Sequence, residues 1–172
     1  MLTWILVAVA VLLAVPVVSH LWTLARPHEV VTEVEIEASP EGVWAVLTDF
    51  AAYPEWNPFI VSARGEPRVG ARLTNRISNN GSTMTFAPEV LAADPGRELR
   101  WIGRFLMPGI VDGEHYFRIE DLGGGRVRLV QGETFTGALV PFAGGALDVA
   151  GGFAAMNEAL KARAEQTAGA LR

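Results

Sequence analysis

The hydrophobic and polar positions divide the chain into an apolar N-terminal segment and a mixed region. Residues 1–25 contain no Asp, Glu, Lys or Arg and are hydrophobic almost throughout. A helix of that length spans a hydrocarbon core of about 30 Å, and Trp4 and Trp22 lie near its ends, where indole rings favour the membrane interface. We predict a single membrane-spanning anchor, with a signal sequence as the alternative. Arg26 follows the segment and favours a cytoplasmic domain after it.

The mixed region begins with a strand and a short helix. Residues 29–37 alternate between apolar and polar positions, which is typical of a half-buried strand. Ser39 and Pro40 then predict the start of a helix, as an N-cap residue followed by a proline in the first turn. This helix is expected to end near Asp49, and two prolines within residues 53–59 predict an aromatic-rich turn.

Period-two alternation from about residue 60 to residue 137, interrupted by turn signals, predicts successive antiparallel strands. Residues 146–171 carry apolar side chains at helical spacing and predict a long amphipathic helix. Glycine pairs at 144–145 and 151–152 predict an irregular helix start, which could form a cavity mouth or only a flexible connection. Residues 29–170 are therefore predicted to form an α+β domain, with the final helix on one face of a curved antiparallel sheet.

The glycine triplet at 123–125 predicts how the two strands that it joins are paired. If the turn is centred on the middle glycine, His115 lies opposite Glu133 and Phe117 opposite Gln131, all on the inward face. A slip of one residue would turn Glu133 outward. Three interpretations of the His115–Glu133 pair stay open: two side chains that satisfy each other's hydrogen bonds, a polar patch that orients a ligand, or a general acid/base pair.

Composition and charge exclude several functional classes. All 19 acidic and 14 basic residues follow residue 25, and a net charge of −5 with a pI near 5.2 leaves no basic excess for nucleic acid. The absence of cysteine excludes disulfides and thiol catalysis. The three histidines are scattered, and there is no calcium loop, phosphate loop or dinucleotide fingerprint, so neither a metal nor a cofactor is expected.

Several segments resemble one protein family in the same order along the chain. They are Asp49-Phe50, Tyr53-Pro54-Glu55-Trp56-Asn57-Pro58-Phe59, Val69-Gly70-Ala71-Arg72-Leu73, Gly113-Glu114-His115-Tyr116-Phe117, residues 131–137 and residues 156–161. Residues 29–168 thereby resemble the START-like or SRPBCC superfamily, near its polyketide cyclase/dehydrase branch. The resemblance implies a helix-grip fold, in which an antiparallel sheet holds the C-terminal helix around an apolar cavity. It implies no single activity, because the superfamily includes lipid carriers, cyclases and regulators. The apolar N-terminal segment is an addition to that domain.

Strand parity and helix phase assign the walls of such a cavity. The expected wall residues are Leu73, Met84, Phe86, Trp101, Phe105, His115, Phe117, Gln131, Glu133, Phe135, Phe153, Met156 and Asn157. An apolar pocket with few polar groups is the usual form of a site for a hydrophobic ligand.

These observations predict a membrane-anchored protein that binds a small hydrophobic or lipid-like molecule and performs no chemistry on it. The alternative is a cyclase or dehydratase in which His115 and Glu133 act as acid and base. A third hypothesis is an interaction module whose interior is filled by side chains. The expected partners are the hydrophobic ligand and the membrane, with no nucleic acid and no metal.

Overall fold

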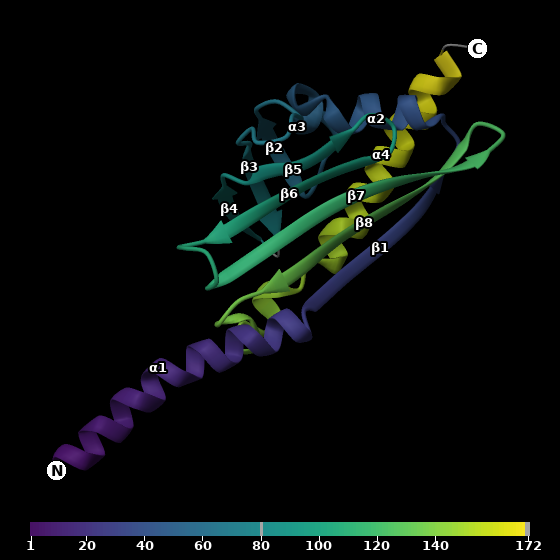
Figure 1. The fold of residues 1–172 in the computed structure, drawn as a ribbon. Helices are drawn as coiled ribbons and strands as arrows, with labels where there is room; N and C mark the ends of the chain where they lie inside the picture. The colour runs from purple at the N-terminus through teal and green to yellow at the C-terminus, as the bar shows by residue number, and fades with distance from the viewer. Residues whose placement is uncertain (80, 171–172) are drawn as a thin grey trace.

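The computed structural model describes residues 1–79 and 81–170 as a long N-terminal helix followed by an α+β fold (Figure 1). Leu171, the last residue of the predicted final helix, lies outside the described residues. The helices are α1 (Leu2–Ala25), α2 (Pro40–Thr48), α3 (Tyr53–Trp56) and α4 (Ala150–Ala170), with short 3-10 turns η1 (Phe50–Ala52), η2 (Val140–Phe142) and η3 (Gly144–Leu147). The strands are β1 (His28–Ile36), β2 (Ile60–Arg64), β3 (Thr74–Asn79), β4 (Ser82–Phe86), β5 (Glu89–Asp94), β6 (Glu98–Phe105), β7 (Val111–Gly123) and β8 (Arg126–Thr136).

Five strands form the main sheet, in the order β1-β8-β7-β6-β5, and every neighbouring pair is antiparallel. The sheet curves around α4, which lies behind it in Figure 1. Phe153, Met156 and Leu160 of α4 are fully buried, and they join inward side chains of the sheet in one hydrophobic core. This arrangement is the predicted helix-grip fold.

The pairing predicted for the glycine hairpin is confirmed. β7 and β8 place His115 opposite Glu133 and Phe117 opposite Gln131. All three glycines of the 123–125 turn have positive φ, between 65° and 76°. Residues other than glycine rarely adopt this backbone conformation, so the glycine triplet determines where the chain turns. The position of the turn in the chain determines the register of β7 and β8.

Three further strands form a smaller sheet in the order β2-β3-β4, a division that the period-two pattern did not resolve. Pro88 lies between β4 and β5 and has no N–H to donate to a neighbouring strand. Its carbonyl accepts a hydrogen bond from the Leu73 N–H at 2.8 Å, and one bridge between Arg72 and Glu89 connects the region to the main sheet. The smaller sheet therefore lies beside the main sheet as a separate layer, joined to it by few hydrogen bonds.

The α2 helix begins as its sequence predicts. Ser39 Oγ accepts a hydrogen bond from the Gly42 N–H at 3.2 Å, and Pro40 occupies the first turn, where its missing N–H costs nothing. The aromatic segment that follows, predicted as a turn, forms η1 and the single helical turn α3. Tyr53 in α3 is buried, and its hydroxyl donates to the Leu47 carbonyl at 2.7 Å.

The α4 helix starts at Ala150 and not at residue 146, because the preceding residues form η2 and η3. Gly144 in η3 has a φ of 52°, which favours glycine. Gly152 has a different role, since a Cβ there would lie 2.3 Å from the ring of Phe59. That ring packs edge-on against Phe153, with centroids 5.3 Å apart. Gly152 thus allows the aromatic segment to contact the start of α4.

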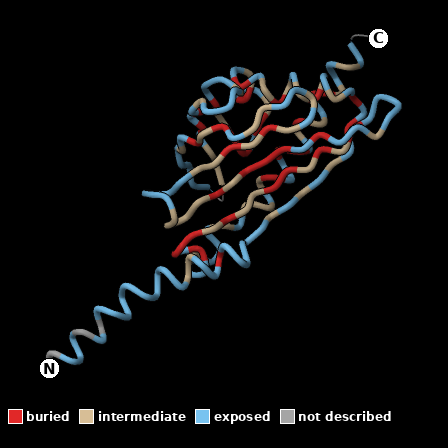
Figure 2. The backbone as a smooth tube through the Cα atoms, viewed as in Figure 1, coloured by how far each residue is buried: buried red, intermediate tan, exposed pale blue. Residues whose placement is uncertain are grey.

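Hydrogen bonds attach the C-terminal end of α1 to the α+β fold. Ser19 Oγ donates to the Ala138 carbonyl at 2.7 Å, and Thr23 Oγ1 accepts from the Gly137 N–H at 2.9 Å. Thr23 is buried, whereas most of α1 is exposed (Figure 2). The helix is long and apolar enough to cross a membrane. It leaves the fold at the end opposite to the C-terminus and the β7–β8 hairpin (Figure 1).

Candidate ligand-binding cavity

A cavity of about 700 Å³ is lined by residues of the main sheet, the smaller sheet and the η2–η3 segment. Strands β6, β7 and β8 contribute Trp101, Gly103, Arg104, Phe105, Val111, Gly113, His115, Glu133 and Phe135. The other lining residues are Phe59, Ile60, Asn75, Ile77, Asn79, Ser82, Met84, Phe86, Pro88, Leu139, Phe142, Ala143, Gly145, Ala146, Leu147 and Val149. The volume lies in the usual range for small-molecule sites, about 300–1,000 Å³. This open interior argues against the interaction module filled by side chains.

The structure divides the predicted wall residues into two groups. Seven line the cavity: Met84, Phe86, Trp101, Phe105, His115, Glu133 and Phe135. The other six are buried outside its walls: Leu73, Phe117, Gln131, Phe153, Met156 and Asn157. All six point inward, as strand parity and helix phase predicted, but neither pattern specifies which part of the sheet α4 covers. The prediction of a cavity wall is therefore corrected: only the first seven residues line the open space, and the other six belong to the packed core.

His115 and Glu133 form a largely buried pair in the cavity wall. His115 Nδ1 lies 3.3 Å from Glu133 Oε2, and the two side chains are 4% and 18% exposed. The indole of Trp101 stacks on the imidazole, with centroids 4.9 Å apart and planes at 6°. Phe153 meets the same ring edge-on at 4.9 Å. The imidazole is therefore held in one orientation by rings on two sides and by the carboxylate.

Protein groups contact both ring nitrogens of His115. Gln131 Nε2 lies 3.2 Å from His115 Nε2, and Glu133 Oε2 lies 3.3 Å from His115 Nδ1. Because protein groups occupy both nitrogens, the imidazole orients the carboxylate and has no free position for a ligand.

Two lining side chains present oxygens that are open to a further hydrogen bond. The buried Asn75 Oδ1 has no partner among the described residues, and the contact of Glu133 with His115 uses Oε2 and not Oε1. The Glu133 oxygen lies beside Gly113, where a Cβ would come within 2.3 Å of it, so glycine makes room for the carboxylate. Asn75 was not among the predicted wall residues, although it shares the strand parity of Ile77, another lining residue. These oxygens can accept hydrogen bonds from a ligand that carries a donor.

The polar groups of the cavity do not form a metal centre. No group of three or more His, Cys, Asp or Glu side chains that could hold a metal occurs in residues 1–79 and 81–170. His115 and Glu133 supply two potential ligands, whereas protein metal sites generally use at least three. The other histidines, His20 in α1 and His28 in β1, do not line the cavity.

Three large apolar side chains of the cavity wall are exposed, and the charged Arg104 lines the cavity beside one of them, Phe105. Phe142, Met84 and Phe105 line it and are 68%, 49% and 44% exposed, respectively. They belong to residues 134–147, 77–88 and 105–111, which contain no Asp, Glu, Lys or Arg. The glycine-containing segment before α4, predicted as either a mouth or a connection, lines the cavity with Ala143, Gly145 and Ala146.

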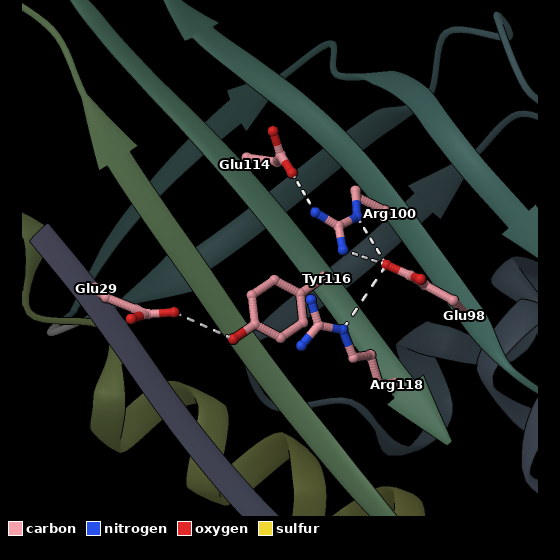
Figure 3. Close-up of polar contacts among 6 residues, drawn as sticks. All are labelled: Glu29, Glu98, Arg100, Glu114, Tyr116 and Arg118. Carbon is pink, nitrogen blue, oxygen red and sulfur yellow. Dashed lines mark hydrogen bonds and ion pairs between the residues drawn. The ribbon is translucent and has the colours of Figure 1, made fainter. Parts of the chain in front are cut away.

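The opposite face of the main sheet carries a separate polar network (Figure 3). Its members are Glu29, Glu98, Arg100, Glu114, Tyr116 and Arg118. Arg100 donates to Glu98 and Glu114. Burial lowers the pKa of the Arg100 guanidinium, but the hydrogen bonds to both carboxylates outweigh this effect and raise the pKa. No member of the network lines the cavity.

A comparison with family models identifies the relationship. A model described as polyketide cyclase / dehydrase and lipid transport matches residues 27–168. The chain belongs to this family. The match confirms the resemblance read from the sequence and begins after α1, so the apolar helix lies outside it. A search of curated proteins finds no match.

Solved structures of this family's fold include both enzymes and a START protein. The Zhui aromatase/cyclase from Streptomyces sp. R1128 has a TM-score of 0.68 at 20% identity, covering 82% of this chain and 95% of that one. A START superfamily protein from Mycobacterium smegmatis has a TM-score of 0.60 at 22% identity, covering 84% and 99%. Norcoclaurine synthase from Thalictrum flavum, in complex with dopamine and hydroxybenzaldehyde, has a TM-score of 0.62 at 14% identity, covering 79% and 85%. At these identities the similarity establishes the fold and not the activity.

Proposed function

We propose that this protein binds a small hydrophobic or lipid-like molecule in its cavity without converting it, and that α1 anchors it in a membrane. The observation that carries the proposal is the cavity of about 700 Å³ with mainly apolar walls. Apolar walls favour an apolar ligand because they remove its surface from water. The free oxygens of Glu133 and Asn75 further favour a ligand with a hydroxyl or amine group.

The buried contact of Thr23 supports an anchor over a cleaved signal sequence. Thr23 is 2% exposed and hydrogen-bonded to the Gly137 backbone. Cleavage after α1 would remove this hydrogen bond together with the one from Ser19 to the Ala138 carbonyl. We therefore propose that α1 stays attached and holds the fold at the membrane surface.

A cyclase or dehydratase is the second candidate, and one observation favours it: Glu133 is a carboxylate in an apolar cavity. The hydrogen bonds of His115 weigh against it, since Gln131 and Glu133 occupy both ring nitrogens. An acid/base mechanism needs a group within reach of the ligand's proton, and only Glu133 Oε1 fits. A dehydratase would return the ligand without the elements of water, which mass spectrometry would detect. A cyclase that closes a ring by addition would return an isomer of the same mass, which chromatography would separate.

Paired probes can test the binding proposal. In the full chain reconstituted in nanodiscs, 1-naphthol should bind about tenfold more tightly than 1-methoxynaphthalene, because only the hydroxyl can donate to Glu133. Empty nanodiscs give the partition background for both probes. The E133L variant should lose the difference between the probes, and E114L, a matched change on the outer face of β7, should keep it.

The proposal is wrong if neither probe binds above the empty nanodiscs and no apolar molecule is extracted with the purified full chain. A preference for 1-naphthol that survives in E133L would retain the cavity as a binding site but overturn the role given to the carboxylate.

A further inference from the structure

Four large apolar side chains are exposed around the open end of the cavity: Leu106, Met107, Leu139 and Phe142. We call these four residues the apolar rim. They are 79%, 61%, 47% and 68% exposed, respectively. Leu139 and Phe142 line the cavity, whereas Leu106 and Met107 lie in the turn between β6 and β7. Apolar groups gathered at one site and facing solvent indicate a surface that is covered by a partner.

The apolar rim and the end of α1 belong to one hydrogen-bonded unit. Ala138 donates its N–H to the Gly109 carbonyl at 2.8 Å, which joins the segment before η2 to the β6–β7 turn. Ser19 of α1 donates to the carbonyl of the same Ala138. His20 of α1 faces Gly109, where a Cβ would lie 3.6 Å from the imidazole. If α1 spans a bilayer, these contacts bring the rim to the bilayer surface.

Charge patterning identifies the chemistry of the surface that fits the rim. The rim lies in residues 105–111 and 134–147, which carry no charge, although the chain contains 33 charged side chains outside α1. Charged groups are costly to place in the acyl region, and their absence permits shallow insertion. The rim itself has no basic residue, and Arg104 beside it is paired with Glu89 at 3.9 Å. Its contact with lipid should therefore not depend on anionic headgroups.

The backbone of Leu106 is a second, independent observation. Leu106 has a φ of 65° and is the only residue other than glycine with a positive φ in residues 1–79 and 81–170. Asn and Gly adopt this conformation readily, whereas leucine is strained there. Its side chain is 79% exposed and has little protein packing to offset the strain. Burial in lipid would offset it.

We propose that the apolar rim inserts into the interfacial and outer acyl region of the bilayer that α1 spans, so that the cavity exchanges its ligand directly with lipid. The inference rests on the proposed anchor and ligand, and it adds the surface through which the ligand passes. An apolar ligand would then move between bilayer and cavity without crossing water, which is the main barrier to its transfer.

Single labels can test the insertion, because the chain has no cysteine of its own. The full chain is reconstituted in phosphatidylcholine vesicles with and without nitroxide-labelled lipid, and an NBD fluorophore is attached at M107C. Quenching should be several-fold stronger at M107C than at V31C, an exposed apolar position on β1, or at R126C, in the distant β7–β8 hairpin. V9C in α1 is the positive control. The M107C quenching should be unchanged when phosphatidylglycerol is added.

The L106N substitution separates membrane contact from folding. Asparagine relieves the strained backbone, so the melting temperature in detergent should be unchanged or higher, while quenching at M107C falls several-fold. V31N is the matched control, since it removes an exposed apolar side chain elsewhere and should leave quenching unchanged. A lower melting temperature with unchanged quenching would mean that Leu106 packs inside the protein, and would overturn the proposal.

The remaining outcomes are distinguishable. Quenching at V9C without quenching at M107C overturns the rim and leaves the anchor intact. No quenching at V9C overturns both. Disulfide cross-linking between M107C copies without lipid quenching would assign the rim to a second copy of the chain and overturn the bilayer contact. A quenched rim in a chain that binds neither naphthalene probe supports the insertion and removes only the binding function.

Discussion

The two faces of the main sheet are built from alternate residues of the same strands, yet they hold their polar groups differently. On the inner face, the His115 and Glu133 side chains are 4% and 18% exposed and are surrounded by aromatic rings. On the outer face, the Arg100 and Glu114 side chains are 24% and 37% exposed (Figure 3). Solvent and salt screen the outer ion pairs, whereas a buried polar group depends on each of its partners. The inner pair should therefore tolerate far less change than the outer network.

The largest effect is expected from removing the imidazole. H115L leaves Glu133 and Gln131 without their shared partner and should lower the free energy of unfolding by about 2–4 kcal/mol. R100M, the matched loss on the outer face, should cost about 1 kcal/mol or less. Denaturant unfolding of the full chain in one detergent measures both. Equal losses for the two variants would contradict the distinction between the faces.

A smaller effect is expected from filling the space beside the carboxylate. Gly113 and Gly103 are cross-strand partners that both line the cavity. A Cβ at Gly113 would lie 2.3 Å from Glu133 Oε1, but at Gly103 the nearest atom would be 4.0 Å away. G113A should therefore weaken 1-naphthol binding about tenfold, the equivalent of one displaced hydrogen bond. G103A should change the affinity by less than about twofold; a similar loss in both variants would mean that cavity volume, and not the carboxylate, controls binding.

The smallest effect concerns pH and the two tyrosines of the chain. Burial, followed by the charge of Asp49, raises the pKa of Tyr53 in the core; burial, followed by the charge of Glu29, raises the pKa of Tyr116 on the outer face. In the unfolded chain both ionise near about pH 10. The native state thus keeps its protons to higher pH, so this contribution to stability is complete below about pH 10 and is lost as the pH rises further.

Tyrosinate absorbance should resolve the two groups. In the folded chain Tyr116 should ionise reversibly above its ordinary range, and Tyr53 should ionise only as circular dichroism reports unfolding. Y53F should remove the absorbance change that accompanies unfolding and keep the earlier one. Reversible ionisation of both tyrosines in the folded chain would show that Tyr53 is not sealed in the core.

Local patterns predicted much of the fold because each depends on neighbours in the chain. The glycine hairpin determined that His115 faces Glu133, and the Ser39–Pro40 pair determined where α2 begins. The start of α4 was less predictable. Gly144 and Gly152 showed that the segment is irregular, but the contact of Gly152 with Phe59 joins residues far apart in sequence.

The cavity shows where local patterns stop being informative. Trp101 and Phe117 both point to the inner face of the main sheet, yet Trp101 lines the cavity and Phe117 is fully buried in the core. Asn75 was missed for a related reason, since it becomes a wall residue only when the smaller sheet stands beside the main one. Parity specifies a face of a sheet, and only packing specifies what covers that face.

By itself, the sequence determined the apolar helix, the order of strands and helices, the family and the His115–Glu133 pair, because periodicity and turn chemistry act over short stretches of chain. The tertiary structure alone decided which inward side chains line an open cavity, that Gln131 contacts the second ring nitrogen of His115, and that α1 is attached beside the apolar rim. Each of these depends on contacts between segments distant in sequence, whose positions follow from the packing of the whole fold.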